Sequence, residues 1–388
     1  MIDEQLVAAM ATTLAMQPDL DARLSDVITP ERALRYLTAL EAVPCPSQTA
    51  RWTRIPVVER LLRDEGMLGE PGVRWDASVG QSGNAALLLG ARDRAKRVWL
   101  LSHLDQISYL LNPGDGERYP LTPICYHMQQ EPSRPALALR FDLASQALVM
   151  AAKGAIEVTG PHAAFVPEAL TELRAGTRVV YANDLTWDAA SDELRGHLDD
   201  TVAVTASLLA ANVLRHYPVE VLVGLTDEEE GPPGDANQSF GRGGRRLASL
   251  FPAPRVAIVS DVHEAETMRH GPGPRNLQPG DGATFAERSS NGRGSVTPPH
   301  LYAWQQHLAL ALEQRGIRLR ENWGGYVSRS EDINATAVTP NIALIGILCS
   351  NRHYAEAQPA AALSDVVDLA KVMVAYTLLA HSAVWVEG

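Results

Sequence analysis

The sequence VEVLVGLTDEEE at residues 219–230 is the stretch that decides the expected fold. Its first half is a short run of β-branched and aliphatic residues, which is typical of a strand buried in a parallel sheet. The run ends in four consecutive acids, Asp227 to Glu230. Adjacent carboxylates repel one another, so their place directly after a buried strand is best explained by one or more cations that neutralise them. A solvated acidic turn is the simpler alternative. The rest of the sequence is needed to decide between a cation site and such a turn.

The composition is that of a globular protein with one large α/β part and room for a smaller part. The chain has 388 residues, and 46% of them are hydrophobic. Its 34 basic and 46 acidic residues give a net charge of -12, which argues against nucleic acid or an anionic membrane as the main partner. Cys45, Cys125 and Cys349 lack metal-ligand spacing, and the first residues lack the pattern of a signal peptide. We therefore expect a cytoplasmic protein.

Helical and strand patterns alternate over most of the chain. Helices are expected within 3–41, at 55–65, 201–215 and 298–314, and from 363 onward; strands are expected within 73–89 and at 97–102, 219–225, 255–260 and 341–349. The segments 231–246 and 271–297, rich in Gly, are expected to be loops. The apolar segment 366–386 is interrupted by charged residues and should be a packed helix, not a membrane span. The alternation predicts an α/β fold with a mixed, largely parallel sheet flanked by helices.

The stretch 107–195 has a different texture. It contains short alternating runs, such as 139–143 and 156–158, separated by Gly and Pro and with little helical periodicity. This pattern predicts a small all-β domain inserted into a larger domain formed by 1–106 and 196–388. Because short strands leave edges that need covering, we expect the insertion to make subunit contacts.

Residues that can bind metal ions follow several of the expected strands. Four strands are followed by His103, by Glu228 with Glu229, by Asp261 and by His353, and Asp199 precedes an expected helix. In an open α/β sheet, residues distant in the sequence meet at the carboxyl ends of the strands. Five or six nitrogen and oxygen ligands are too many for one tetrahedral zinc, but they suit two metals that share a bridging carboxylate. The sequence therefore predicts a dinuclear metal centre.

A family resemblance rests on five short segments. These are HLD (103–105), LDD (198–200), DEE (227–229), SDV (260–262) and RHYAE (352–356). In this order and at these intervals they resemble the tetrahedral aminopeptidases, also called glutamyl aminopeptidases and once described as endoglucanases, which are dinuclear metallopeptidases. The resemblance begins at about residue 35 and leaves a helical extension, 1–30, outside it. It implies that the 107–195 insertion is a dimerisation domain, that the protein forms homo-oligomers, and that the metals are zinc or cobalt.

The resemblance also implies roles for single residues. One metal would be held by His103 and Asp261, the other by Glu229 and His353, with Asp199 bridging the two. Glu228 would be the general base, acting on a metal-bridging hydroxide, and Asp105 would orient His103. The expected activity is that of an aminopeptidase, which removes N-terminal residues from peptides.

The chain departs from the family pattern at three places. Thr201 stands where the family has Arg after the Asp-Asp pair. His353 follows Arg352 directly, whereas two residues separate this pair in the family. The family's Gly-Gly-Thr-Asp segment is only faintly present, at 324–325 and 331–332. We therefore expect an altered substrate pocket.

Other functions are compatible with parts of the pattern. The related carboxypeptidases and deacylases share the metal ligands, and an amidase or deacylase acting on a small N-acyl substrate is one alternative; their insertion, however, is an α/β lid, not a β-rich unit. A glycosidase with paired carboxylates would explain the acids but not the histidines. A catalytically inactive assembly protein that kept the fold is a further alternative, and metal content would distinguish it.

The basic segment GRGGRR at 241–246 follows the acidic run. Its arginines could reach the mouth of the site and pair with an acidic side chain or a terminal carboxylate of a substrate. A solvated, flexible loop is the alternative.

Overall fold

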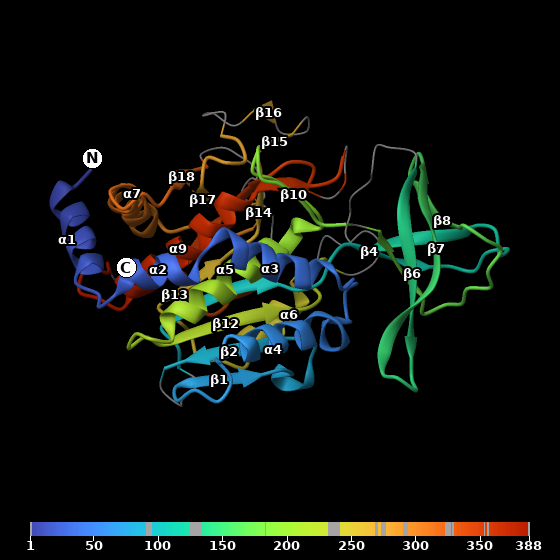
Figure 1. Cartoon of the computed structure of the whole chain (residues 1–388), viewed down its shortest axis with the longest axis horizontal. Helices are drawn as coiled ribbons and strands as arrows, with labels where there is room; N and C mark the ends of the chain where they lie inside the picture. Colours follow the sequence, from blue (N-terminus) through green and yellow to red (C-terminus); the bar gives the residue numbers. More distant parts are fainter. Residues whose placement is uncertain are drawn as a thin grey trace.

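A computed structural model describes residues 2–90, 95–124, 133–182, 184–231, 241–267, 271–272, 277–289, 294–322, 327, 330–352, 354 and 357–386. Its centre is a nine-stranded sheet with the strand order β1-β2-β12-β3-β13-β19-β17-β18, and β14 pairs with β19 (Figure 1). The strands are β1 (Val73–Asp76), β2 (Ala85–Leu89), β3 (Val98–His103), β12 (Val221–Thr226), β13 (Val256–Val259), β14 (Val262–Glu264), β17 (Ala283–Ala286), β18 (Leu319–Glu321) and β19 (Ile342–Cys349). The four central strands from β12 to β19 run parallel, while β2 and β17 join them antiparallel.

The central strands are apolar because both faces of the sheet are covered. Every residue of β3, β12, β13 and β19 is buried. Strands buried on both faces are near-continuous aliphatic runs, which is the pattern that the sequence shows at these positions. The predicted fold class, a mixed and largely parallel sheet flanked by helices, is confirmed.

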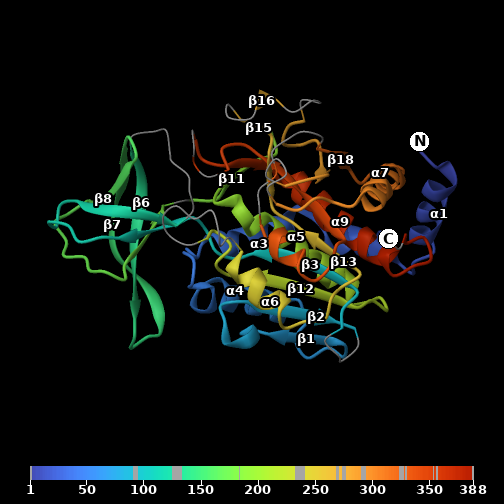
Figure 2. The same ribbon diagram turned by 180° about the vertical axis from the view of Figure 1, so that it is seen from behind.

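Two sets of helices cover the two faces of the sheet. The larger set is α1 (Glu4–Ala15), α2 (Leu20–Val27), α3 (Pro30–Glu41), α4 (Arg54–Asp64), α5 (Leu198–Leu214), α7 (Pro299–Glu313) and α9 (Leu363–Ala380). The opposite face packs against α6 (Arg242–Ala248) and α8 (Asp332–Ala335). Figure 1 shows α3 and α5 in front of the sheet, and Figure 2 shows α6 on the reverse side. Within the described residues, no helix has both the length and the apolar character needed to cross a membrane.

The N-terminal helices form as the sequence predicts. Asp3 caps α1 by accepting hydrogen bonds from two backbone N–H groups, and Thr29 caps α3, which begins at Pro30. The backbone N–H of Asp3 also donates to the ring of His307 on α7, which ties the extension to the body. Both termini lie at the end of the molecule opposite the β insertion (Figure 1).

The insertion is a closed barrel, visible on the right of Figure 1. Its strands, in the order in which they pair, are β4 (Ser108–Leu111), β5 (Tyr119–Ile124), β8 (His162–Pro167), β7 (Ala147–Thr159), β6 (Ser133–Asp142) and β9 (Arg178–Tyr181). The barrel has its own apolar core, which includes Tyr109, Ile156 and Phe165. The inserted all-β unit expected from the sequence is therefore present; the domain boundaries 107 and 195 and the role of the unit in dimerisation stay predictions.

Short elements flank the barrel and the sheet. They are β10 (Thr186–Asp188), β11 (Glu193–Arg195), β15 (Glu266–Thr267), β16 (Gly271–Pro272), β20 (Ala360–Ala362), η1 (Ala50–Trp52) and η2 (Val79–Gln81). Although β10 and β11 fall within the stretch 107–195, β11 pairs with β20 of the larger unit. The C-terminal half of the molecule thus holds the end of the insertion in place.

Two segments that were expected to be loops contain regular structure. Helix α6 begins within 231–246 and ends at Ala248. Its glycines let it lie directly on the chain after β12, since a Cβ on Gly243 would lie 1.9 Å from the backbone oxygen of Asp227. Strand β17 forms within 271–297, where four residues pair with β19 and three of them also pair with β18. Neither element has the length or periodicity that reveals a helix or a strand in sequence alone.

Candidate metal centre

The carboxyl ends of the central strands meet at one edge of the sheet. Strand β3 ends at His103, which lies opposite Thr226, the last residue of β12. Strand β13 is in register with β3 through Val259, so Asp261 follows at the same edge. The parallel register therefore brings together the residues after three strands, as expected for an open α/β sheet.

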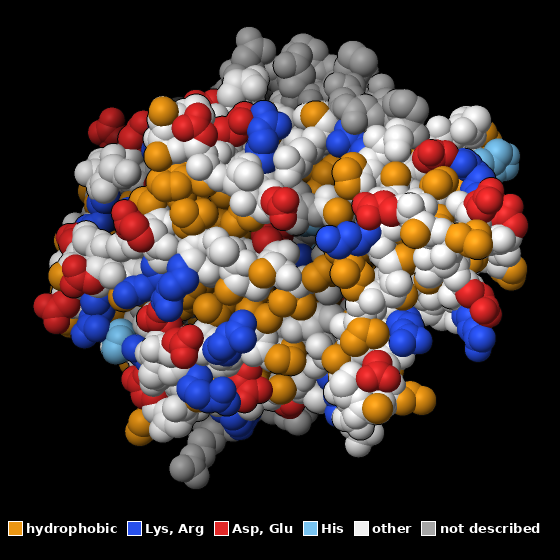
Figure 3. Space-filling view, turned by 45° about the vertical axis from the view of Figure 1, so that its right-hand side comes forward, with side chains coloured by type: hydrophobic (Ala, Val, Ile, Leu, Met, Phe, Trp, Pro, Cys, Tyr) orange, Lys and Arg blue, Asp and Glu red, His pale blue; other side chains and the backbone are white. Residues whose placement is uncertain are grey.

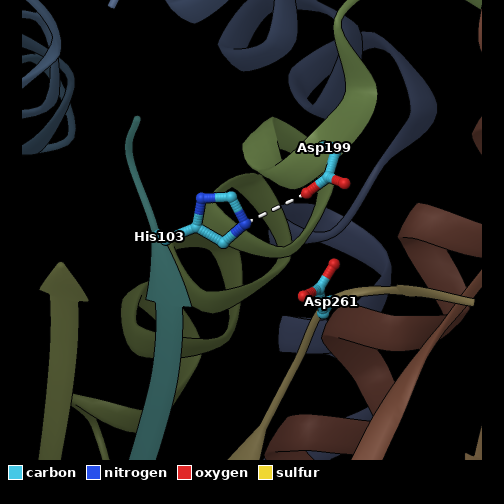
Figure 4. Close-up of side chains that lie close together, drawn as sticks. All are labelled: His103, Asp199 and Asp261. Carbon is cyan, nitrogen blue, oxygen red and sulfur yellow. Dashed lines mark hydrogen bonds and ion pairs between the residues drawn. The ribbon is translucent and has the colours of Figure 1, made fainter. Parts of the chain in front are cut away.

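His103, Asp199 and Asp261 form the first group of candidate metal ligands. The Nε2 atom of His103 lies 3.0 Å from Oδ1 of Asp199, and one ligand atom from each of the three residues lies within 4.8 Å of the others. Their exposed fractions are 1%, 7% and 5%. Figure 4 shows the three side chains converging from the end of β3, the start of α5 and the segment after β13.

A second group shares His103 and adds two acids of the run after β12. Glu229 Oε2 lies 3.9 Å from His103 Nε2, and ligand atoms of His103, Glu229 and Glu230 lie within 4.8 Å of one another. The sequence predicted Glu229 as a ligand but did not single out Glu230, which is 2% exposed. The run of four acids was the available signal; the resemblance drew attention to its first three members.

The electrostatics of the cluster favour a bound cation. Burial, together with the charge of Asp199, raises the pKa of Asp261 to about 8, and burial with the charge of Glu230 raises the pKa of Glu229 well above its usual range. Burial lowers the pKa of His103, but the carboxylates of Glu229, Asp105 and Asp199 more than offset this and raise it well above its usual value. In the metal-free protein, ionising all of these buried carboxyl groups together therefore costs free energy. A divalent cation would relieve that cost.

The donor set fits divalent metals. It offers one imidazole nitrogen and four carboxylates, and borderline dications such as zinc take nitrogen and oxygen ligands of these kinds. The two groups overlap at His103, so the donors extend over more space than one tetrahedral ion needs. The predicted ligand His353 lies outside the described residues.

Asp105 organises the acidic run from behind the ligands. Its carboxylate accepts hydrogen bonds from the backbone N–H groups of Glu229 (3.0 Å) and Glu230 (3.3 Å) and from the hydroxyl of Ser47 (2.5 Å). The ring atom Nδ1 of His103 lies 3.0 Å from the backbone oxygen of Asp105 and 3.7 Å from its Oδ1. Asp105 therefore links the imidazole to the backbone of the two candidate carboxylate ligands.

Asp227 and Glu228, the first two acids of the run, belong to neither ligand group. The Asp227 carboxylate accepts hydrogen bonds from the backbone N–H groups of Gln48 (2.8 Å) and Ala50 (3.1 Å). Glu228, which has a φ of 66°, is ion-paired to Arg246 at 2.5 Å and Arg242 at 3.1 Å. The basic segment is thus a helix whose arginines reach the predicted general base.

A buried ion pair lies behind the two segments that carry His103 and Asp199. Arg54, which is 1% exposed, donates to the backbone oxygen of Leu104 (2.7 Å) and lies 3.7 Å from Glu41. Glu41 in turn accepts from the backbone N–H of His197 (2.7 Å) and from the hydroxyl of Thr201 (2.7 Å). The pair fixes both segments, and Thr201, which replaces the Arg of the family pattern, is one of its partners. No local pattern in the sequence links these residues.

Arg352 was noted in the sequence only for its spacing, and the structure places it at the site. Its Nη1 lies 3.6 Å from Oδ2 of Asp199, and its Nε lies 3.8 Å from Glu264. Of the faint Gly-Gly-Thr-Asp counterpart, 324–325 lies outside the described residues. Glu331 is fully buried and accepts a hydrogen bond from the hydroxyl of Thr226 (2.6 Å), so it supports the end of β12.

A buried group of histidine and carboxylate ligands at the carboxyl edge of a largely parallel sheet defines a candidate divalent-metal centre in an α/β protein. No protein-family model and no curated protein matches this sequence. Solved structures match the fold along most of the chain.

The matching structures include aminopeptidases. Aminopeptidase APDkam598 from the archaeon Desulfurococcus kamchatkensis aligns with a TM-score of 0.69 at 16% identity, over 90% of this chain and 95% of that one. A TET aminopeptidase from a marine-sediment Thaumarchaeota archaeon has a TM-score of 0.70 at 13% identity, over 89% and 96%. The Pyrococcus horikoshii TET1 peptidase, which can assemble into a tetrahedron or a large octahedral shell, has a TM-score of 0.66 at 15% identity, over 89% and 99%. At these identities the likeness establishes the fold, which is the one that the resemblance implied.

Proposed function

We propose that this protein is a metal-dependent aminopeptidase that hydrolyses the first peptide bond of a peptide at a site for two divalent metal ions. The observation that carries the proposal is the pair of overlapping ligand groups at the carboxyl ends of the central strands, on a fold shared with aminopeptidases. One metal would be held by His103 and Asp261 and the other by Glu229 and His353, with Asp199 between them and Glu230 as a further donor. Zinc suits this donor set, and cobalt is the alternative.

The metals, when bound, would supply an activated water and polarise the scissile carbonyl. The chain supplies the proton transfer. Glu228 belongs to neither ligand group, and its carboxylate, which is held by Arg242 and Arg246, is the proposed group that takes a proton from the attacking water and delivers it to the leaving amine. Asp105 and the Arg54–Glu41 pair hold the ligand-bearing segments in position through the hydrogen bonds described above.

The barrel supports an aminopeptidase over the deacylase alternative. The related carboxypeptidases and deacylases carry an α/β lid, whereas the barrel described here is built from antiparallel strands. We further propose that the barrel mediates self-association and that the protein works in the reducing cytoplasm. In support of the compartment, Cys45 and Cys349 are buried free thiols within the described part of the chain.

Two variants test the roles of the acidic run. Glu229→Gln should lose one metal per chain, because its carboxylate is a proposed direct ligand. Glu228→Gln should retain the metal content of the unchanged protein but lose turnover by a factor on the order of 10² to 10⁴, the usual contribution of a positioned general base. Metal content by mass spectrometry and hydrolysis of aminoacyl p-nitroanilides should be measured on the same samples.

The controls separate the possible failures. Asp21→Asn, an exposed acid on α2, should change neither quantity. An N-acetylated peptide should resist cleavage, because an aminopeptidase requires a free N-terminus. If Glu228→Gln loses metal as Glu229→Gln does, the roles are shifted by one residue along the run. If it keeps both metals and full activity, the proposed mechanism is wrong.

A further inference from the structure

Two arginines on α6 converge on one carboxylate at the candidate centre. Arg242 Nη2 lies 3.1 Å from Glu228 Oε2, and Arg246 Nη1 lies 2.5 Å from Glu228 Oε1. Residues four apart lie on the same side of a helix, so both guanidinium groups point the same way. Their side chains are 31% and 46% exposed, whereas that of Glu228 is 10% exposed. The arginines therefore lie on the solvent side of the predicted base.

The helix that carries these arginines is fixed against the acidic run. The backbone N–H of Gly241 donates to the oxygen of Glu229 (3.0 Å), and that of Arg242 donates to the oxygen of Glu228 (3.1 Å). The Asn84 amide group binds both segments, since it donates to the oxygen of Gly243 (2.8 Å) and accepts from the N–H of Asp227 (3.0 Å). The guanidinium groups are thus held near Glu228 by the backbone as well as by their own ion pairs.

The group formed by Arg242, Arg246 and Glu228 has hydrogen-bond donors left over for an anion. Two guanidinium groups carry ten N–H donors in total, and one carboxylate can accept only a few of them. The neighbouring carboxylates are engaged elsewhere: Asp227 with backbone N–H groups, and Glu331 with the hydroxyls of Thr226 and Ser330. Among the described residues, the two guanidinium groups therefore carry one positive charge more than Glu228 can neutralise, on the open side of the site.

The position of the arginines matches that of a leaving group. If Glu228 delivers a proton to the leaving amine, that nitrogen must come within about 3 Å of its carboxylate. In a dipeptide the same nitrogen belongs to the C-terminal residue, whose carboxylate carbon is only two bonds away, about 2.5 Å. The carboxylate carbon of a dipeptide consequently lies within about 5.5 Å of the Glu228 carboxylate, on which both arginines converge.

We propose that Arg242 and Arg246 bind the free α-carboxylate of the leaving residue, so that this enzyme prefers dipeptides and discriminates against longer or C-terminally blocked peptides. The proposal rests on the proposed function and narrows its substrate class. Arginine suits the role because its planar donors match both oxygens of a carboxylate. In a longer peptide the same place is occupied by a neutral peptide group, which cannot form charge-assisted pairs.

The test compares Ala-Ala with its amide, Ala-Ala-NH2, on the metal-loaded enzyme. The expected kcat/KM ratio of dipeptide to amide is between about tenfold and a hundredfold, the range for charge-assisted hydrogen bonds. Arg246→Met and Arg242→Met retain the apolar stem without the charge, and each should bring the ratio close to one. The ratio is the readout because both arginines touch Glu228, and absolute rates are expected to change for both substrates.

Arg245→Met is the matched control. Arg245 lies on the same helix and is exposed, but it is rotated about 100° from Arg246 around the helix axis, so its loss should leave the ratio unchanged. Arg246→Lys should restore part of the ratio, since it returns the charge but not the planar donors. Equal cleavage of dipeptide and amide by the unchanged enzyme, or a ratio that survives both Met variants, overturns this inference alone. Cleavage of neither peptide overturns the proposed function as well.

Discussion

The carboxyl edge of the sheet buries charged side chains, whereas the barrel exposes apolar ones. At the sheet edge, charged side chains such as His103 and Glu229 are nearly inaccessible to solvent. On the barrel, large apolar side chains are exposed: Leu143 at 83% and Met150 at 54%. Both arrangements cost free energy in an isolated chain, because a buried charge needs a counter-charge and an exposed apolar group prefers to leave water. The comparison predicts a different kind of partner for each region, a cation at the sheet edge and an apolar surface at the barrel.

The largest expected effect comes from removing the charge at the centre of the sheet edge. Asp199→Asn keeps the shape of the side chain but weakens a proposed bridge between two metals. We expect metal affinity to fall by more than the roughly 100-fold that the loss of a supporting partner costs, and turnover to disappear with it. Metal titration followed by calorimetry, with peptide hydrolysis measured in parallel, checks this. Retention of two metals per chain would show that Asp199 is not the bridge.

The buried pair behind the site should dominate stability. Arg54→Met leaves Glu41 buried without its guanidinium partner, which typically costs about 3 to 5 kcal/mol in the free energy of unfolding. Adding Glu41→Gln in the same chain should recover a large part of that loss, since the uncompensated charge is then gone. Denaturant unfolding of the metal-free protein gives the values. Arg60→Met, an exposed position on the same helix, is the control and should change stability little. A single Arg54 variant as stable as the control would contradict the role of the pair.

The pH dependence of metal binding tests the role of Asp261 at the carboxyl edge of the sheet. In the metal-free protein, burial first and the charge of Asp199 second raise the pKa of Asp261 to about 8. Below that pH the carboxyl group carries a proton that a metal must displace, and above it no proton remains to be released. Metal affinity should therefore rise up to about pH 8, by roughly tenfold per pH unit for each proton released. Competition with a chelator at several pH values measures the slope. Asp261→Asn should lower this slope by one, because one proton fewer is released when the metal binds. An unchanged slope would exclude Asp261 from the site.

Sequence reasoning succeeded where the signal was local and periodic. The central strands, the N-terminal helices and the inserted β unit each have a pattern that one segment displays by itself. The structure brings together His103, Asp199, Asp261 and Glu229 because parallel strands share a carboxyl edge, and this rule can be applied before the structure is known. That these residues bind metal stays a prediction.

The features that the sequence did not reveal depend on tertiary contacts. The Arg54–Glu41 pair joins two helices to two ligand-bearing segments, and none of these contacts is encoded by spacing. Helix α6 has only seven residues and two internal glycines, so its intrinsic helix propensity is low. Its conformation depends instead on its packing against the acidic run. The pairing of Glu228 with Arg246 follows from that docking. Contacts of this kind have no one-dimensional signature.

The smallest expected effect concerns the barrel. Leu143, Met150 and Phe141 line an open recess of about 790 Å³. The rings of Phe141 and Trp52 pack edge to face, with 4.9 Å between their centroids. Figure 3 shows apolar side chains among charged ones on this part of the surface.

If the recess is a subunit contact, Leu143→Ser and Met150→Ser should each weaken self-association by about 1 to 2 kcal/mol, or roughly tenfold, because less apolar surface leaves water on assembly. The stability of the dissociated chain should hardly change, since both side chains are already exposed in it. Sedimentation velocity over the micromolar range measures the association. Leu310→Ser on α7, at the end of the molecule away from the barrel, removes a side chain that is 37% exposed and serves as the control. Equal weakening by the control would place the contact elsewhere, and a chain that remains monomeric at every concentration would show that this exposed apolar surface does not serve assembly.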